Sequence, residues 1–269
     1  MKIGPQTHHQ TAICASNPET IIVRGKDLTR ELIGKIDFTE YFWLLVTGGV
    51  PSKGQRQVLD ATLVAIAEHG LVPSVQASRM TLAAAPEALQ GAVAAGILGC
   101  GSVVLGSAEA AGRFFALIEQ RRDGGASLDE AITAVVQEYR AAKRAIPGYG
   151  HPLHRGGDPR ALRLLEVGVE TGTRGRYAEV ALRVEKMLPT LIGKSLTLNV
   201  SGAIPAVLLD TSFPLQALKG IPILARTAGL IAHLLEEQLR PIGFVLSHAA
   251  EQAISYDGPA PDGFKPSEE

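Results

Sequence analysis

The sequence has 269 residues, of which 46% are hydrophobic and only 5% are aromatic. Its apolar residues are mainly alanine, leucine, valine and isoleucine, and this composition favours closely packed helices over a β-sandwich. Basic and acidic residues balance, 26 against 27, so no net field recruits nucleic acid or an anionic membrane. Cys14 and Cys100 lack C-x-x-C spacing, which predicts buried free thiols in a reducing cytoplasm rather than a disulfide framework or a metal site.

The first 17 residues are polar and carry no apolar run of the kind that precedes a signal-peptide cleavage site. Glycine or charged residues interrupt the long apolar stretches before about 18 residues, the length a membrane-spanning helix needs. We therefore expect a cytoplasmic protein with no signal peptide and no membrane contact.

The first predicted element is an irregular or hairpin segment over residues 11–30, where short apolar runs alternate with glycine and aspartate. A helix follows, beginning after Asp37, whose side chain is expected to cap it. Glu40, three residues later, completes the pattern of a capping box. Gly48 and Gly49 are expected to end this helix.

Helical spacing of apolar residues predicts most of the remaining chain. The expected helices cover residues 51–69, 74–99 with a break near Pro86, 109–122, 128–145, 159–170, 176–191, 203–210 and 222–238. The Pro-Gly-Tyr-Gly run at 147–150 cannot continue a helix. Strands are scarce and no linker divides the chain, so we predict an all-α fold in which any second domain is inserted into the first.

The most distinctive string is Ile-Pro-Gly-Tyr-Gly-His-Pro-Leu-His-Arg at 146–155, followed by Asp158-Pro159-Arg160. A Pro/Gly-rich turn here delivers His151 beside a loop with exposed backbone donors. Arg160 follows in the first turn of the next predicted helix. Taken alone, His151 is explained as a polar residue in a tight turn. The whole string, however, resembles the citrate synthase signature P-G-Y-G-H followed by D-P-R.

That resemblance extends along nearly the whole chain. Residues 38–51 resemble the family's early helix ending in G-x-x-P, and 67–70 (Ala-Glu-His-Gly) are similar to its A-D-H motif. Residues 198–200 (Leu-Asn-Val) resemble the L-N-V-D motif, and 225–229 with Arg240-Pro241 resemble two later arginine motifs. The resemblance implies a citrate synthase-like fold and a homodimer. It implies a large helical domain from residues 1–106 and 209–269, a small helical domain from 107–208, and an active site in the cleft.

The resemblance also implies roles for individual residues. It implies that a loop reads the adenine of CoA through its backbone, and this loop comprises Ile146, Pro147, Gly148, Tyr149 and Gly150. His151 would hydrogen-bond the oxo or hydroxyl oxygen of a carboxylate substrate, and His69 would bind the same substrate.

Arginines are implied to hold the substrate carboxylates, and the planar guanidinium suits this role because it grips a carboxylate through two hydrogen bonds. Arg160, Arg226 and Arg240 would together neutralise a di- or tricarboxylate, with Arg240 reaching across from the partner subunit. The ordinary structural explanation for Arg226 and Arg240 is a charge on a helix face or at a helix end. For His69 it is a partner of the helix dipole.

Two positions depart from the family pattern. Leu105 stands where the family has a histidine that stabilises the enol of the acyl thioester, and Ser201 stands where an aspartate removes the α-proton. Proton transfer and oxyanion stabilisation are each worth roughly 10²-fold or more in rate. Condensation of acetyl-CoA with oxaloacetate is therefore expected to be severely impaired.

Other side chains are candidates for the missing roles. Glu109 lies one helical turn beyond Leu105, and His154 lies near His151, but a surface charge and a turn residue are the favoured explanations for these two residues. Asp210 is a poor substitute for the aspartate, because it follows Ser201 by about 13 Å along a helix.

These observations predict an enzyme of the citrate synthase family, either a carbon–carbon lyase or an acyl-CoA transferase. The leading hypothesis is a citryl-CoA-lyase-like reaction, with His151, Ser201 and His69 as catalytic residues and the CoA thioester as a substrate rather than a cofactor. The alternatives are a citrate or 2-methylcitrate synthase with altered substrates and a non-catalytic protein that binds a carboxylate or CoA.

Overall fold

The computed structural model of the protein describes residues 9–101, 106–150 and 157–264. The chain forms two units: unit 1 contains Met1–Ile66 and Leu105–Pro222, and unit 2 contains Ala67–Val104 and Ile223–Glu269. Residues 107–208, expected as a small inserted domain, all lie in unit 1. The proposed boundaries between a large and a small domain stay a prediction.

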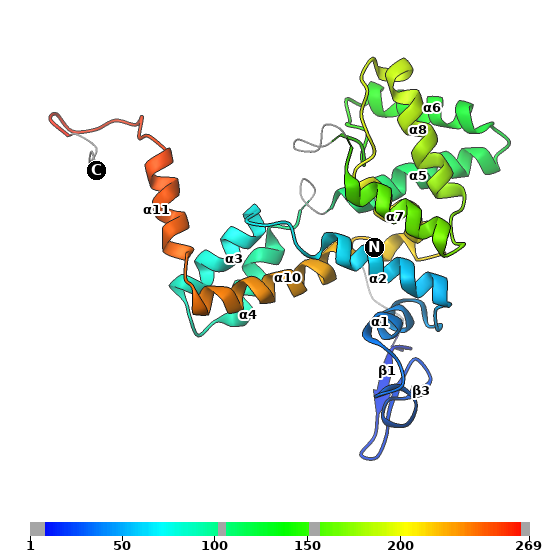
Figure 1. The fold of residues 1–269 in the computed structure, drawn as a ribbon, viewed down its shortest axis with the longest axis horizontal. Coiled ribbons are helices and arrows are strands. Elements are labelled where there is room, and N and C mark those ends of the chain that lie inside the picture. Colours follow the sequence, from blue (N-terminus) through cyan, green and yellow to red (C-terminus); the bar gives the residue numbers. More distant parts are fainter. Residues whose placement is uncertain (1–8, 102–105, 151–156, 265–269) are drawn as a thin grey trace. The chain divides into compact units, whose positions relative to one another are not determined.

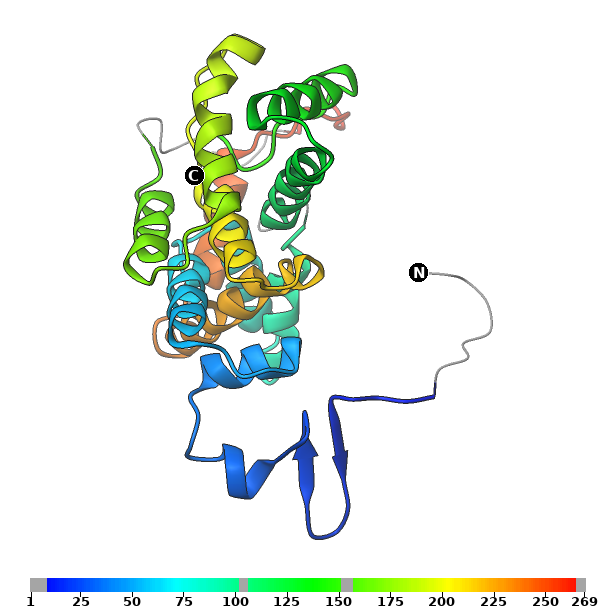
Figure 2. The same cartoon turned by 90° about the vertical axis from the view of Figure 1, so that its right-hand side faces the viewer.

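Unit 1 begins with a small sheet in which β1 (Cys14–Ser16) pairs antiparallel with β2 (Ile21–Val23), which in turn pairs with β3 (Lys26–Asp27). Figure 2 shows the first two strands, in dark blue, running in opposite directions. A short π-helix, η1 (Leu28–Leu32), follows, and Val23, Leu32 and Leu44 form a hydrophobic cluster beneath the sheet. The predicted hairpin is confirmed. The prediction that both thiols are buried is correct for Cys100 but wrong for Cys14, because β1 is exposed along its whole length.

Helix α1 (Phe38–Thr47) begins with the predicted capping box. The Asp37 Oδ1 atom accepts the Glu40 N–H at 2.8 Å, and Glu40 Oε2 accepts the Asp37 N–H at 3.4 Å. Gly48 ends the helix in the left-handed conformation, with φ of 81°. Trp43 on the buried face meets the Phe213 ring edge-on at 5.4 Å between centroids. Both ends of this helix are therefore as predicted.

Further helices of unit 1 follow along the chain (Figure 1). They are α2 (Lys53–Ala67), α5 (Ser107–Asp123), α6 (Leu128–Ala141), α7 (Pro159–Glu170), α8 (Arg176–Ile192) and α9 (Val200–Asp210). Helix α9 is buried over residues 202–208 because α5, α7 and α8 all pack against it. The segment that leads into the N-terminus of α9 is therefore attached to a buried helix.

Unit 2 contains α3 (Pro73–Ala84), α4 (Leu89–Leu98), α10 (Gly220–Leu239, whose first turn belongs to unit 1) and α11 (Gly243–Ala253). Leu82, Ala92 and Leu234 join α3, α4 and α10 in one core, and α3 also contacts α11. The break near Pro86 separates α3 from α4 as predicted. The described chain is thus mostly helical, which confirms the all-α class.

Most predicted helix bounds lie within two residues of the observed ones, but two boundaries differ by more and one helix was missed. Helix α6 ends at Ala141 rather than 145, because Lys143 adopts a left-handed φ of 53°. Helix α9 begins at Val200 rather than 203, because the Asn199 side chain caps it. Helix α11 was not predicted, since residues after 238 carry no strong helical spacing beyond Pro241.

One helical stretch in the described chain, Leu215–Leu239, is long and apolar enough to cross a membrane by length and composition. Only 44% of its most apolar window is buried within the protein, and buried core helices pass the same test. The expectation of no membrane contact stays a prediction.

Candidate active site

The predicted CoA loop, residues 146–150, is hydrogen-bonded to the segment that leads into α9. Gly150 N–H donates to Thr197 O at 2.7 Å, and Asn199 N–H donates to Gly148 O at 3.0 Å. The Asn199 side chain donates from Nδ2 to Gly150 O at 2.6 Å. Asn199 therefore joins the loop to α9 while it also caps that helix by accepting the Gly202 N–H at 3.2 Å.

Close backbone approach explains two glycines at this junction. Gly148 has φ of 87°, and a Cβ atom there would lie 2.8 Å from the Gly202 Cα. A Cβ on Gly202 would lie 2.6 Å from the Gly148 carbonyl oxygen. Such contacts are closer than side chains tolerate, so the loop and the first turn of α9 touch through bare backbone.

Tyr149 anchors the loop in the core of unit 1. Its hydroxyl donates to Ala181 O at 2.8 Å, and its ring meets Phe115 edge-on at 6.4 Å. Burial raises the pKa of this phenol well above its usual value, with a contribution from the nearby Glu185 carboxylate. Because the Tyr149 ring is buried, contact with CoA at this position would be made by the loop backbone.

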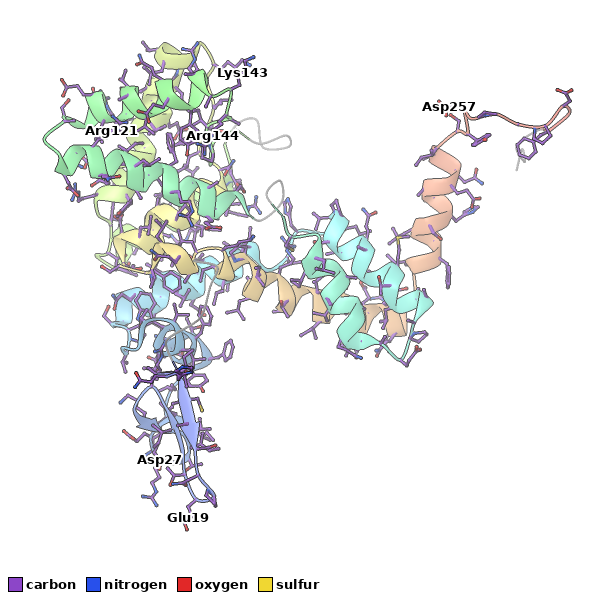
Figure 3. All side chains as sticks on the ribbon, turned by 180° about the vertical axis from the view of Figure 1, so that it is seen from behind. Glu19, Asp27, Arg121, Lys143, Arg144 and Asp257 are labelled. Carbon is purple, nitrogen blue, oxygen red and sulfur yellow. The ribbon has the colours of Figure 1, made fainter. Side chains whose placement is uncertain are left out.

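Two basic residues, Lys143 and Arg144, connect α6 to this loop (Figure 3). The Arg144 guanidinium lies 4.0 Å from the centroid of the Tyr139 ring, a cation–π contact. Two positively charged residues therefore lie just before the loop in the chain.

Asp158 orients Arg160. Its Oδ1 accepts the Arg160 Nε at 3.0 Å, and its Oδ2 accepts the Arg160 Nη2 at 2.9 Å and the Val200 N–H at 2.9 Å. Burial by itself raises the pKa of Asp158, but the hydrogen bonds from Arg160 and Val200 outweigh it and the net pKa is lowered. The Arg160 Nη1 atom has no hydrogen-bond partner within the described residues, which leaves it available to an incoming anion.

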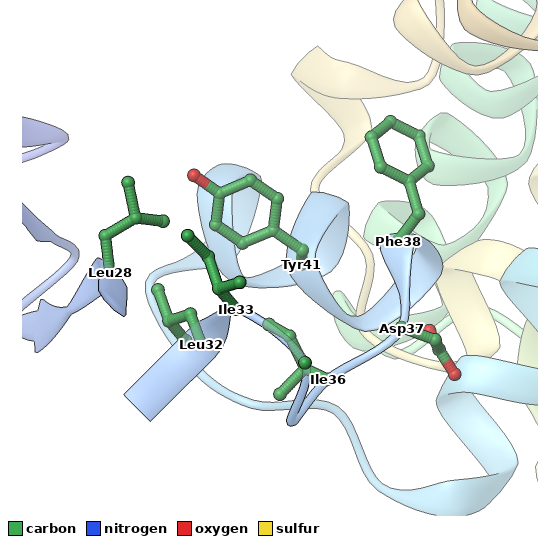
Figure 4. A pocket seen from close by; sticks show the side chains of 8 residues that line it. Leu28, Leu32, Ile33, Ile36, Asp37, Phe38 and Tyr41 are labelled. Carbon is green, nitrogen blue, oxygen red and sulfur yellow. The ribbon is translucent and has the colours of Figure 1, made fainter. Parts of the chain in front are cut away.

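Arg160 also lines a hollow of about 480 Å³ between α2 and α7. Arg163 also lines this hollow, and its remaining walls are apolar side chains, including Ala61, Val64 and Leu164. A second hollow, shown in Figure 4, lies beside η1 and α1 and is lined mainly by Leu28, Leu32 and Phe38. Asp37 lines this second hollow, but its carboxylate caps α1. The hollow contains none of the predicted site residues, so we do not assign it to the candidate site.

Ser201 is the second residue of α9 and is half-buried. Two carboxylates in the described part of the chain were candidates for a replacement base, Asp210 and Glu109, and both are engaged in other contacts. Asp210 accepts the N–H groups of Gly175 at 2.7 Å and Tyr177 at 2.8 Å and so caps α8. Glu109 pairs with Arg113 at 2.7 Å on the surface. His151, His154 and Leu105 lie outside the described residues.

In unit 2, His69 lies in the exposed turn between α2 and α3. The Glu68 Oε1 atom accepts the N–H groups of His69 at 2.8 Å and Gly70 at 2.5 Å. The Glu68 Oε2 atom lies 3.0 Å from His233 Nε2 on α10. Burial by itself raises the pKa of Glu68, but the contacts with His233 and Gly70 N–H outweigh it and lower the net pKa.

Arg226 and Arg240 belong to the same unit. Arg226 is buried on α10, with 3% of its surface exposed. Arg240 follows the end of α10, and its side chain is 81% exposed with Nη2 at 3.1 Å from Glu236 Oε1. The predicted residues thus fall into two groups: the loop 146–150, Arg160 and Ser201 in unit 1, and His69, Arg226 and Arg240 in unit 2.

A buried ion pair holds the backbone next to Arg240. Arg79 on α3 donates from Nε to Glu237 Oε2 at 2.6 Å and from Nη2 to Arg240 O at 3.1 Å. Glu237 Oε1 also accepts the N–H groups of Ile242 at 3.0 Å and Gly243 at 2.7 Å. Sequence reasoning did not identify either partner. Within the described residues, no group of three or more histidine, cysteine, aspartate or glutamate side chains is placed to hold a metal.

Comparison with known proteins defines the class. Residues 34–242 match the family model described as "Citrate synthase, C-terminal domain", so the chain belongs to the citrate synthase family. It is similar to the solved structure of citryl-CoA lyase from Hydrogenobacter thermophilus, with a TM-score of 0.83 and 31% identity. The match covers 95% of this chain and 97% of that one.

Curated relatives are more distant. A citrate synthase from Synechocystis sp. is 25% identical over 76% of this chain and 50% of its own length. A citrate/2-methylcitrate synthase from Bacillus subtilis is 26% identical over 83% of this chain and 57% of its own length. The chain therefore spans about half the length of the curated relatives it matches.

Proposed function

We propose that the protein is a carbon–carbon lyase of the citryl-CoA lyase type. It would cleave citryl-CoA, or a related hydroxyacyl-CoA, into an oxoacid and an acyl-CoA. One observation carries this proposal: the match to the H. thermophilus citryl-CoA lyase covers nearly the whole of both chains, whereas the two synthases extend well beyond the matched region.

The charged residues support a carboxylate-rich substrate. Asp158 holds two of the three guanidinium nitrogens of Arg160, and the third, Nη1, which no other described residue bonds, is the proposed donor to an anion. Arg226 and Arg240 supply two further guanidinium groups, and His69 supplies a ring donor. Three arginines suit a substrate with two or three carboxylates.

The replacement of the family aspartate by Ser201 also favours cleavage. In the proposed step His151 accepts the proton of the tertiary hydroxyl. The bond between that carbon and the carbon next to the thioester breaks, and its electron pair forms the acyl-CoA enolate. Water or Ser201 protonates this enolate. The step begins without removal of a proton from carbon, so it depends less on a base at position 201 than condensation does.

The assembly proposed for this reaction is a cytoplasmic homodimer in which Arg240 completes the partner's site. The exposure of the Arg240 side chain, 81%, is consistent with a role outside its own unit. The proposed ligands are a di- or tricarboxylate and an acyl-CoA thioester, the latter bound at residues 146–150.

Two alternatives remain. The B. subtilis relative supports a citrate or 2-methylcitrate synthase with altered substrates. The loss of both enolising residues at Leu105 and Ser201 supports a non-catalytic protein that binds a carboxylate or CoA.

One experiment separates the three functions. The purified protein is incubated with citryl-CoA and, separately, with oxaloacetate plus acetyl-CoA, while free CoA and oxaloacetate are followed. Oxaloacetate release from citryl-CoA alone supports the lyase, and CoA release only from the pair supports the synthase. If neither incubation gives a product but CoA binding is measurable, the non-catalytic function is supported. Arg30→Ala, which removes an exposed arginine on η1, serves as the control variant for loss of surface charge.

A further inference from the structure

One face of α10 carries Arg226, Gly229 and His233. Residues separated by three or four positions lie on the same face of a helix, so these residues form one stripe. Arg226 is a proposed carboxylate ligand, whereas Gly229 and His233 have no assigned role. Gly229 and His233 of this stripe contact the turn that carries His69.

Glu68 connects this turn to α10. One carboxylate oxygen accepts both backbone N–H groups that follow it, those of His69 and Gly70, and the other oxygen meets His233 Nε2 at 3.0 Å. A carboxylate that accepts several N–H groups forms charge-assisted bonds, which are about twice as strong as neutral ones. The backbone of His69 is therefore bonded to a side chain that is itself held by α10.

Gly229 brings the helix against the same turn. A Cβ atom at this position would lie 2.3 Å from the carbonyl oxygen of Ala67 and 3.0 Å from Glu68 Oε2. Backbone carbonyl oxygen cannot yield as a flexible side chain does, so any larger residue would push the turn away from α10. This contact is independent of the Glu68 hydrogen bonds and acts at the same place.

We infer that Glu68 and His233 are positioning residues that fix the His69 turn at a set distance from Arg226. The inference rests on the proposed function, in which His69 and Arg226 bind one carboxylate substrate. Neither Glu68 nor His233 needs to touch that substrate. Their effect is to prevent His69 from moving relative to Arg226, which lies one helical turn before Gly229. A displacement of about 1 Å in such a site can cost up to about 10²-fold in rate.

Two measurements on the full chain test the inference. The first is hydrogen exchange of the His69 and Gly70 amides in the absence of ligand. The second is the affinity for oxaloacetate by calorimetry, with CoA affinity as the internal reference. The variants are Glu68→Ala, Glu68→Gln, His233→Ala and the double variant Glu68→Ala/His233→Ala. His248→Ala, an exposed histidine on α11, is the matched control.

We expect Glu68→Ala to speed exchange at both amides about tenfold and to weaken oxaloacetate binding about tenfold, with CoA affinity within twofold of wild type. Glu68→Gln keeps a carbonyl acceptor for both N–H groups and should restore most of the protection. His233→Ala should have an intermediate effect, and the double variant should match Glu68→Ala, because His233 acts through Glu68. His248→Ala should resemble wild type.

Unchanged oxaloacetate affinity in Glu68→Ala would overturn the inference, as would equal losses of oxaloacetate and CoA affinity, which indicate general destabilisation. If wild-type protein binds no oxaloacetate, the proposed function fails. The exchange measurement then still decides whether Glu68 and His233 hold the turn, since it requires no ligand.

Discussion

The buried pair between Arg79 and Glu237 provides the most direct test of what holds unit 2 together. Each side chain is 3% exposed, and the Arg79 Nε lies 2.6 Å from Glu237 Oε2. Arg79 also donates to the Arg240 carbonyl and to Glu236 at 2.9 Å. Replacement of Arg79 by methionine keeps most of the side-chain volume but leaves the Glu237 carboxylate buried without its counter-charge.

Removal of one partner of a buried ion pair typically costs 3–5 kcal/mol. Glu237 retains the N–H groups of Ile242 and Gly243, which still stabilise its charge. We therefore expect Arg79→Met to lower the free energy of unfolding of unit 2 by about 3 kcal/mol, at the lower end of that range. The Arg240 backbone loses a donor at the same time, so affinity for a carboxylate ligand should also fall.

Hydrogen exchange over α3 and α11 measures this loss within unit 2, and urea unfolding measures it for the whole chain. Arg163→Met is the matched control, because Arg163 pairs with Glu166 and Glu170 on the surface and such pairs contribute little. The double variant Arg79→Met/Glu237→Gln should regain most of the stability, because the amide removes the unpaired charge and keeps an acceptor for the N–H groups of Ile242 and Gly243. The reasoning is refuted if Arg79→Met is no more destabilising than Arg163→Met, or if the double variant is the least stable of all.

Four further predictions concern the proposed site. His151→Ala should abolish turnover with an unchanged circular dichroism spectrum, and wild-type activity would remove His151 from the site. Mixed dimers of His151→Ala and Arg240→Ala should recover about one working site per heterodimer if Arg240 acts in trans. If activity does not recover after subunit exchange has been confirmed, Arg240 does not act in trans. The unmodified protein should exchange the methyl protons of acetyl-CoA with deuterated solvent very slowly, and Leu105→His with Ser201→Asp should raise that rate; fast exchange in wild type would show that another base has taken over. The pKa of Asp158 is lowered on folding, so its contribution to stability is complete above the unfolded value of 3.8 and is lost as pH falls through the folded value. The stability difference between wild type and Asp158→Asn should therefore shrink below about pH 4 in urea unfolding, and a constant difference would contradict the assigned hydrogen bonds.

Local chemistry made much of the fold predictable. The capping box of Asp37 and Glu40 needs only residues three positions apart, and the same holds for Ser127 and Glu130 at the start of α6. Bounds that depend on longer-range bonds were predicted less well. Helix α9 begins three residues early because Asn199, its cap, is itself held by the loop at Gly150.

The family string and the arginine motifs predicted the candidate site residues, and residue type alone indicated the arginines as candidate carboxylate ligands. Only the tertiary structure revealed what positions them. Asp158 meets Val200 across 42 residues of sequence, and Arg79 meets Glu237 across 158. The spacing of apolar residues along the chain does not predict such pairs, because the partner of a buried charge depends on which helix faces pack together. The sequence therefore determined the candidate ligands, and helix packing determined the hydrogen bonds that hold them.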